Sequence, residues 1–277
     1  MLVCTLGDLL LDVVVRLPGP LAPGDDVPAE TSVGAGGQAA NVAAWASALG
    51  GCGRFLGRRA ADAVGRVVAA DVTARGVELR GPIVSGRTGA VVSLVDRSGA
   101  RTMASDRGVS PGLRPDDVEG GWLDGCACLH ISGYGLVAEP MGAAAERAVE
   151  LARRFGVQVS IDLSSWTAIR DFGPRRFRER LQQLAPDVLF ATEREHDMLG
   201  RELPAPMRVL KRGRDGCLFA REGIEVDLPA AGADVVDSTG AGDALAAGFL
   251  LGGSLEEAAR RALGAAARCV SQPGAMP

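Results

Sequence analysis

Short apolar segments and segments with helical periodicity alternate through most of this chain. Residues 2–6 form the first apolar run and predict a strand, and residues 39–49 carry Val42, Trp45 and Leu49 at helical spacing. The same pattern predicts further helices at 60–75, 140–155, 175–184, 193–199 and 255–270, and further strands at 129–132, 157–163, 188–191, 208–211, 216–221 and 224–227. Strands that alternate with helices form a mostly parallel sheet, so we expect an α/β fold with helices on both faces of a central sheet.

Two extended stretches do not follow this alternation. They lie at about 13–33 and 87–105, and within the second the turn-forming residues 96–99 separate two apolar runs, which indicates a hairpin. Because the two stretches come from different parts of the chain, we expect a small separate β-sheet that lies over one edge of the main sheet, as a lid would. No long linker or internal repeat is visible, so residues 1–277 are expected to form a single domain.

Composition and charge narrow the class of protein. The chain has 277 residues, of which 47% are hydrophobic, enough for one large core. No apolar run reaches the roughly 18 residues of a membrane span, and no signal peptide is recognisable, so we expect a cytoplasmic protein with no membrane partner. The net charge of −4 argues against a nucleic-acid partner, and the basic run at 175–180 is interpreted as a solvated helix face.

The most informative segment is the sequence DSTGAGD at residues 237–243. Val235 and Val236 predict a strand that enters it, and the apolar run 244–250 predicts a helix that leaves it. The turn between them contains Gly240, Ala241 and Gly242. These small residues permit a tight turn, and the first N–H groups of a helix are unpaired and carry partial positive charge, so the segment is expected to bind an anion.

Asp243 lies in the first turn of that predicted helix. A carboxylate beside an anion site repels phosphate, so it is better suited to accept the proton of a hydroxyl group that attacks the phosphate. The alternative is an acidic residue that only caps the helix, since such caps are common.

Other sequence motifs with a known chemistry are excluded, because a residue or a spacing that they require is absent. Residues 34–39 match the dinucleotide pattern GxGxxA, but no acidic residue follows at the expected distance of about 20 residues. Residues 108–112 match the nucleophile elbow GxSxG, but Pro111 has no N–H to complete an oxyanion hole. Lys211 is the only lysine of the chain and does not lie in a P-loop pattern, and the two histidines lack metal-ligand spacing.

Other polar or glycine-rich pieces also lie where predicted strands end or helices begin. They are Asp8 and Asp12, then Gly36, Gly37 and Asn41, and the turn 211–216. Open α/β sheets bind ligands at the carboxyl edge of their strands, so we expect these pieces to meet residues 237–243 there. Taken singly, Asn41 also fits a helix cap, Asp12 a turn acid and 211–216 a surface turn.

Together these segments resemble the ribokinase-like, or PfkB, family of carbohydrate and nucleoside kinases, over essentially the whole chain. Residues 36–41 (GGQAAN) match its N-terminal pattern, and residues 237–243 match its C-terminal pattern DxxGAGD. The resemblance implies a three-layer ribokinase-like fold with a small β-sheet lid. It also implies a kinase, a phosphotransferase with an alcohol acceptor, that uses ATP and Mg2+.

The resemblance further implies roles for individual residues. Asp243 would be the base, and the N–H groups that follow Gly240, namely those of Ala241, Gly242 and Asp243, would bind the transferred phosphoryl group. The residues expected to bind the acceptor are Asp8, Asp12, Gly36, Gly37, Asn41 and Arg107. The residues expected to bind the nucleotide are Thr192, Lys211, Gly213, Gly216, Ala267 and Ser271.

Three residues are candidates for binding cations. Glu195 matches the glutamate of a family NxxE motif that organises Mg2+, although Thr192 replaces the asparagine of that motif. Asp237 and Thr239 match positions that bind a monovalent cation in some members, which leaves dependence on K+ open. Arg212 stands where the family usually has Thr or Ser, and its charge suits contact with phosphate.

Three functions follow from the resemblance, in order of preference. They are a sugar kinase, a nucleoside kinase of the adenosine or pseudouridine type, and a non-catalytic sugar-binding protein. Only 4% of the residues are aromatic and the lid stretches contain none, which disfavours a wall for a nucleobase. We expect a neutral sugar, with at most one arginine of the lid hairpin in contact with it. The apolar residues Val13, Val15, Val91 and Leu94 leave a homodimer through the lid open.

Overall fold

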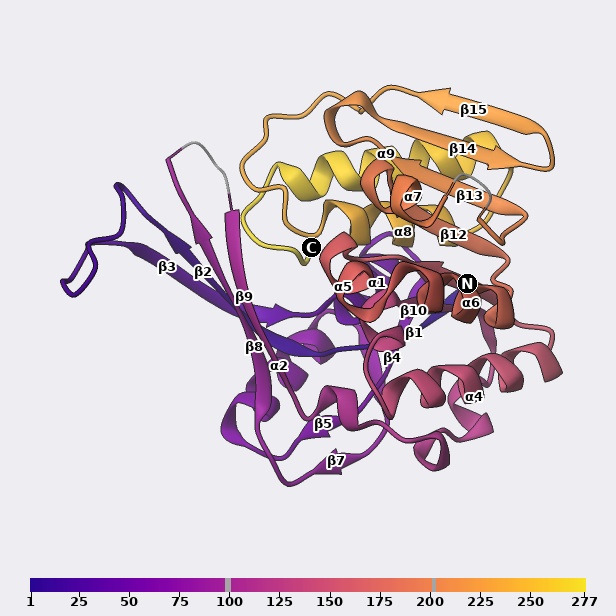
Figure 1. The fold of residues 1–277 in the computed structure, drawn as a ribbon, viewed down its shortest axis with the longest axis horizontal. Coiled ribbons are helices and arrows are strands. Elements are labelled where there is room, and N and C mark those ends of the chain that lie inside the picture. The colour runs from indigo at the N-terminus through magenta and orange to yellow at the C-terminus, as the bar shows by residue number, and fades with distance from the viewer. Residues whose placement is uncertain (98–100, 201–202) are drawn as a thin grey trace.

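The main sheet of the protein runs through the centre of the molecule (Figure 1). The computed structural model describes residues 1–97, 101–200 and 203–277. The strands of this sheet are β1 (Leu2–Leu6), β4 (Cys52–Leu56), β6 (Val77–Arg80), β10 (Cys126–Ser132), β11 (Gln158–Asp162), β12 (Val188–Thr192), β13 (Met207–Lys211), β14 (Cys217–Arg221) and β15 (Ile224–Leu228). Their order is β15-β14-β13-β12-β11-β10-β1-β4-β6, and only the pairs that involve β14 are antiparallel. The expectation of a mostly parallel sheet is confirmed.

Helices cover both faces of this sheet because side chains of a strand alternate between its faces. Cys4 and Leu6 of β1 pack into a core with α4 (Met141–Arg154) and α6 (Pro174–Leu184). Val3 packs into a second core with α1 (Gln38–Ala48), α8 (Ala241–Leu250) and α9 (Leu255–Val270). The remaining helices are α2 (Ala63–Ala74), α3 (Gly133–Leu136), α5 (Trp166–Phe172) and α7 (Glu193–Leu199). None of the helices in the described residues is long and apolar enough to cross a membrane.

A second sheet, which we call the small sheet, projects from the main body (Figure 1). It consists of β2 (Leu10–Arg16), β3 (Glu30–Gly36), β8 (Thr88–Val95) and β9 (Arg101–Gly108) in the order β3-β2-β8-β9. β2 and β8 are parallel although they come from distant parts of the chain, and β8 and β9 form the predicted hairpin. Residues 98–99 of its turn lie outside the described residues. A short parallel pair, β5 (Arg59–Ala60) and β7 (Ile83–Val84), lies apart from both sheets.

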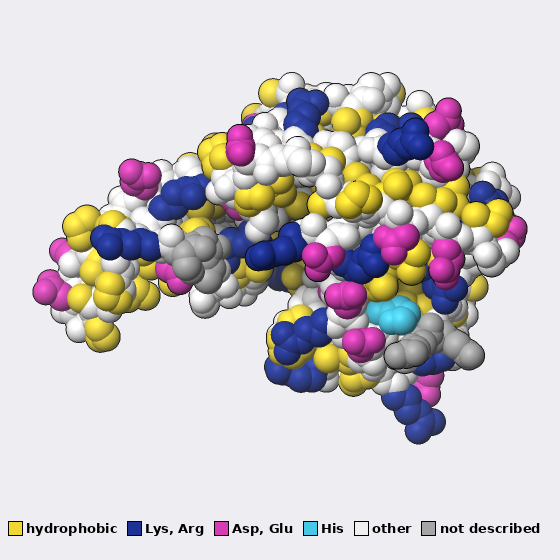
Figure 2. All heavy atoms as spheres, turned by 90° about the horizontal axis from the view of Figure 1, so that it is seen from above, with side chains coloured by type: hydrophobic (Ala, Val, Ile, Leu, Met, Phe, Trp, Pro, Cys, Tyr) yellow, Lys and Arg dark blue, Asp and Glu magenta, His cyan; other side chains and the backbone are white. Residues whose placement is uncertain are grey.

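The two faces of the small sheet differ in character. Strand register places Val13 beside Val92, and Val15 beside Leu94, on one apolar face. Val91 pairs with Asp12 and therefore lies on the opposite face. It is thus separated from Val13, Val15 and Leu94, with which it was grouped as a candidate dimer surface. Figure 2 shows basic side chains along the projecting part and where it joins the main body.

The strand predicted at Val235 and Val236 is wrong. These residues lie in an irregular segment, and their side chains are exposed. The N–H groups of Val236 and Asp237 instead donate to the carbonyl oxygen of Val270, at 2.7 and 3.1 Å. The segment that leads into α8 is therefore attached to the end of α9 rather than to the sheet.

Candidate active site

The predicted anion site lies at the N-terminus of α8. Gly240 precedes the helix in the left-handed conformation (φ 78°), and a Cβ atom there would lie 2.6 Å from Cα of Ala275, so only glycine fits. The N–H of Ala244 donates to the Gly240 carbonyl at 2.9 Å and begins the helix. Within the described residues the N–H groups of Gly242 and Asp243 have no hydrogen-bond acceptor. Two unpaired N–H groups thus point outward at the positive end of a helix, which suits an oxyanion.

Asp243 lies beside those N–H groups and is held by α1. The Asn41 side chain donates from Nδ2 to Asp243 Oδ2 at 2.7 Å, across 202 residues of sequence. Burial raises the pKa of Asp243 to about 7, although the bond from Asn41 and the charge of Lys211 act in the opposite direction. A carboxyl group with this pKa exchanges a proton readily near neutral pH, as a general base must.

Lys211, at the end of β13, carries the positive charge of the site. Its Nζ lies 2.6 Å from Oδ2 of Asp162, which is fully buried at the end of β11. Burial acts to lower the pKa of Lys211, but the carboxylates of Asp162 and Glu195 outweigh it and raise that pKa. Lys211 is therefore a cation at neutral pH, enclosed by acidic groups and available to a phosphate beside α8.

Glu195 is buried where α7 begins. Its Oε2 accepts the N–H of Thr192 at 2.7 Å, and Thr192 Oγ1 accepts the N–H of Glu195 at 3.4 Å. The two residues form a capping box, so threonine is a sound structural replacement for the family asparagine. Burial raises the pKa of Glu195, and Lys211 partly offsets that effect.

Two buried oxygens of the predicted acceptor residues lack partners. They are Oδ1 of Asp8 and Oδ1 of Asn41, and neither has a hydrogen-bond partner among the described residues. The second oxygen of Asp8 accepts a hydrogen bond from Arg107, whose guanidinium lies 3.7 Å from the ring centroid of Tyr134. A buried acceptor without a donor costs free energy unless a ligand supplies one. The pair therefore indicates a ligand with hydroxyl groups.

Gly36 and Gly37 create the space for the acidic side chains. A Cβ atom on Gly36 would overlap the carboxylate of Asp12, and a Cβ atom on Gly37 would lie against the backbone oxygen of Asp8. Gly37 also has a positive φ of 99°. Burial and the nearby charge of Asp237 raise the pKa of Asp12 to about 6.

Asp237 and Thr239 form a compact turn before α8. Asp237 Oδ1 accepts both the N–H (2.9 Å) and the hydroxyl (2.6 Å) of Thr239, and Oδ2 accepts the N–H of Gly274 at 3.1 Å. Burial acts to raise the pKa of Asp237, but these bonds and Arg101 lower it. Asp237 is therefore ionised and fully engaged within the protein.

The remaining predicted nucleotide residues lie in two adjacent elements. Gly213 and Gly216 have positive φ angles of 58° and 91° in the turn between β13 and β14. Ala267 and Ser271 lie at the end of α9, where Ser271 Oγ donates to the Ala267 carbonyl at 3.0 Å. α9 packs against β14, the strand that follows this turn.

Two residues of the site were not predicted. Asp162 ends a correctly predicted strand, at the edge where ligand groups were expected, so its position was a usable signal. Gln38 lies inside the GGQAAN motif; its Oε1 accepts hydrogen bonds from Ser132 and Ser164, and its side chain also contacts Asp243 and lowers its pKa. Asp162 thus holds the ammonium group of Lys211, and Gln38 holds the carboxylate of Asp243.

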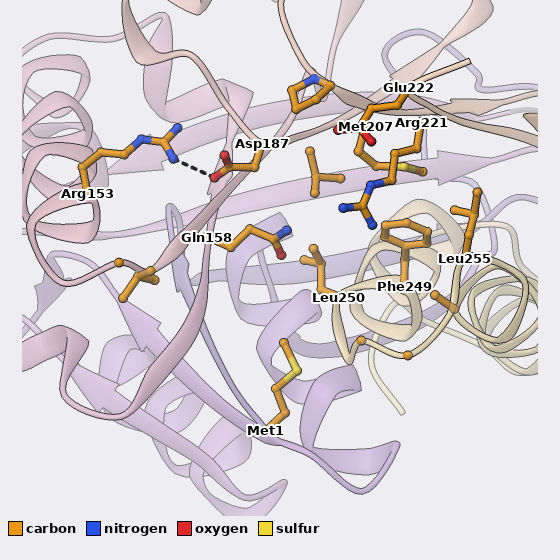
Figure 3. A pocket seen from close by; sticks show the side chains of 17 residues that line it. Met1, Arg153, Gln158, Asp187, Met207, Arg221, Glu222, Phe249, Leu250 and Leu255 are labelled. Carbon is orange, nitrogen blue, oxygen red and sulfur yellow. Dashed lines mark hydrogen bonds and ion pairs between the residues drawn. The ribbon is translucent and has the colours of Figure 1, made fainter. Parts of the chain in front are cut away.

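A cavity of about 530 Å3 lies elsewhere, at the amino ends of β11 and β13 and the end of α8 (Figure 3). Gln158, Met207 and Leu250 line it, and its ion pair joins Arg153 to Asp187 at 2.8 Å. It contains none of the predicted site residues. The cavity is therefore distinct from the candidate active site around Asp243, at the carboxyl edge of the sheet.

Comparisons with known proteins concern the family and the fold of the chain. Residues 1–277 match the model described as pfkB family carbohydrate kinase. The ATP-dependent ribose-1-phosphate kinase of Halopiger xanaduensis is 29% identical, over 90% of this chain and 83% of that protein. The 5-dehydro-2-deoxygluconokinase of Geobacillus thermodenitrificans is 28% identical, over 78% and 71%. The crystal structure of adenosine kinase from Sinorhizobium meliloti has a TM-score of 0.89 at 25% identity, over 99% and 95%, which confirms the expected fold.

Proposed function

The chain belongs to the pfkB family of carbohydrate kinases and is an ATP-dependent sugar kinase, and from this premise we propose that Asp243 is its catalytic base. The observation that carries the proposal is the position of Asp243, which Asn41 holds at 2.7 Å beside the unpaired N–H groups of α8. A hydroxyl group bound there lies between a proton acceptor and an oxyanion site, as phosphoryl transfer requires.

The transfer follows from these positions. The acceptor hydroxyl gives its proton to Asp243 while its oxygen forms a bond to the γ-phosphorus of ATP. The bond from that phosphorus to the bridging oxygen breaks, and ADP leaves. The N–H groups of Gly242 and Asp243 stabilise the charge on the transferred group, and Lys211 offers a cation to the phosphates. The small sheet, closing as a lid, would keep water from the phosphoryl group.

Mg2+ fits this site as a partner of the ATP phosphates. The described residues contain no group of three acidic, histidine or cysteine side chains able to hold a metal by themselves. Mg2+ bound with a nucleotide usually needs only one or two carboxylates, and Glu195, whose charge acts on Lys211, would serve as one. When bound, the ion neutralises charge on the phosphates.

The polar groups favour a sugar over a nucleoside as the acceptor. The unpaired Oδ1 atoms of Asp8 and Asn41 match hydroxyl donors of a polyol. Tyr134 is the only tyrosine, and Arg107 covers one face of its ring, so that face is not available to stack on a base. Arg107 is itself paired with Asp8, which leaves little free charge for a phosphorylated acceptor. We propose a neutral sugar, and a homodimer through the apolar face of Val13, Val15 and Leu94.

The test is ADP release from Mg·ATP with a panel of neutral sugars, sugar acids, sugar phosphates and nucleosides. A signal with a neutral sugar, absent in Asp243→Asn, supports the proposal. A signal only with sugar phosphates or only with nucleosides would replace the acceptor class and keep the base. Silence with every acceptor, despite measurable ATP binding, would favour a non-catalytic binding protein.

The activity is expected to rise with pH. Protonated Asp243 cannot accept a proton, and its pKa is raised to about 7, so the active ionised form increases as pH rises through that value. A profile of kcat/KM for the acceptor against pH should show one ascending limb near neutral pH. A limb near pH 4, the ordinary value for an aspartic acid, would contradict the assignment.

Gly36→Ala is expected to weaken acceptor binding selectively. The added methyl group overlaps the Asp12 carboxylate, and overpacking of this kind costs about 1–3 kcal/mol, so the acceptor KM should rise about fivefold or more with the ATP KM unchanged. Gly34→Ala is the control, because a Cβ atom there meets no atom within 4 Å. Equal KM values in both variants would remove Asp12 from the acceptor site.

A further inference from the structure

Two arginines of the small sheet converge on Asp237, in the turn before α8. Arg101 Nη1 lies 3.5 Å from Asp237 Oδ1 and also donates to the hydroxyl oxygen of Thr239. Arg16 Nη2 lies 3.8 Å from the other oxygen, Oδ2. The Asp237 side chain is only 4% exposed, so its charge has little solvent to stabilise it. The two guanidinium groups supply the compensating charge.

Strand register explains why these two arginines act together. Arg16 pairs with Val95 across β2 and β8, and Val95 pairs with Arg101 across β8 and β9. Residues directly opposite each other in neighbouring strands point to the same face. Both guanidinium groups therefore leave the small sheet on the face that bears Asp12 and meets the main body.

The guanidinium of Arg101 takes the place that a monovalent cation would need at this turn. Asp237 Oδ1 already accepts two hydrogen bonds from Thr239, and Oδ2 accepts the N–H of Gly274. The Thr239 hydroxyl oxygen is in turn occupied by Arg101. The resemblance drawn from the sequence places a possible K+ at these same two residues, and the structure places a guanidinium there instead.

We propose that Arg101, supported by Arg16, replaces the monovalent cation at Asp237 and Thr239 and so makes phosphoryl transfer independent of K+. Arg101 is a positioning residue, because it holds the turn that supplies the anion site and does not touch the reacting atoms. Since Arg101 belongs to the small sheet, its contribution to holding the turn depends on that sheet lying over the turn. This inference rests on the proposed kinase function for its kinetic consequences.

The experiment compares initial rates in potassium chloride and in choline chloride at equal ionic strength. The wild type should give the same kcat in both salts. Arg101→Met should lose about tenfold or more in kcat, with the acceptor KM changed less, because Asp237 loses the nearer of its two guanidinium partners and the turn is held less firmly. Arg101→Lys should retain more activity than Arg101→Met. The matched control is Arg97→Met, an exposed arginine in the same hairpin, which should behave as the wild type.

Chemical rescue separates a cation at this site from a general structural role. Methylguanidinium or K+ should restore part of the rate of Arg101→Met and leave the rates of the wild type and Arg97→Met unchanged. If the wild type needs K+, or if Arg101→Met keeps the full rate in choline chloride, the inference is wrong while the kinase function stands.

Thermal unfolding tests the inference without any assay of activity. K+ should raise the Tm of Arg101→Met relative to choline and should not change the Tm of the wild type or of Arg97→Met. A rise in the wild-type Tm with K+ would overturn the inference, whatever the activity assay shows. If no acceptor is phosphorylated but the Tm values behave as expected, the proposed function is wrong and the inference stands.

Discussion

Asp243→Asn is expected to lower kcat by about 10³-fold while the Kd for ATP changes little, because loss of a general base acts on the chemical step. Asparagine has nearly the same shape and can still accept a hydrogen bond from Asn41 through its side-chain oxygen, so the geometry of the N-terminus of α8 should persist. It cannot accept the proton of the acceptor hydroxyl. Steady-state rates and calorimetric titration with a non-hydrolysable ATP analogue measure the two quantities.

Asp234→Asn is the matched control for this prediction. Asp234 is exposed in the irregular segment before the same turn, so its replacement removes one negative charge without touching the site. Its kcat should equal that of the wild type. If Asp243→Asn retained more than about a tenth of the activity, the base would have to be another group, since general-base catalysis contributes about 10²–10⁴-fold.

Lys211→Met is expected to lower the free energy of unfolding by about 3–5 kcal/mol, the usual cost of removing one partner of a buried ion pair. The cost arises at Asp162, which is fully buried and would lose the ammonium group 2.6 Å from its Oδ2. Urea unfolding at neutral pH measures the change. Phosphoryl transfer should fall as well, because the site loses its cation.

A second variant shows whether the loss comes from Asp162. Lys211→Met combined with Asp162→Asn also removes the buried charge of Asp162, which the single variant leaves without its partner, so most of the lost stability should return. The coupling energy between the two sites should be about 0.5–3 kcal/mol, as for residues in direct contact. Strictly additive changes would mean that the Asp162–Lys211 pair does not set the stability of this region.

The sequence predicted that Asn41 and Asp243 lie close together although they are far apart in the chain, and in the structure their side chains form a hydrogen bond. The prediction succeeded because both lie in small-residue motifs beside helix starts, and such motifs gather at one edge of a parallel sheet. The same reasoning failed at Val235 and Val236, since a pair of β-branched residues is too short to define a period. The backbone at Val236 instead forms a hydrogen bond with the end of α9, not with a neighbouring strand.

Other features were hidden because they depend on partners that are distant in sequence. In the sequence of β4, Arg54 is a charged residue that would be expected at the surface. In the structure its Nε pairs with Glu78 of β6 at 2.6 Å, and its side chain is largely buried. In the sequence, Arg101 likewise has no feature that distinguishes it from other hairpin residues. Only the fold brings it beside Asp237. Long side chains that find their counter-charge across the fold carry no local signature.

The central position of β1 has a consequence for how this chain is made. β1 is synthesised before β10, one of its two neighbours in the sheet, whose residues Cys126–Ser132 emerge much later. At a synthesis rate of about 5–20 residues per second, that delay is roughly 6–25 s. Throughout it the nascent chain exposes one edge of an apolar strand, the kind of edge on which chains associate. Fragments that end before Cys126 should therefore aggregate, and the growing chain should depend on chaperones that bind near the ribosome.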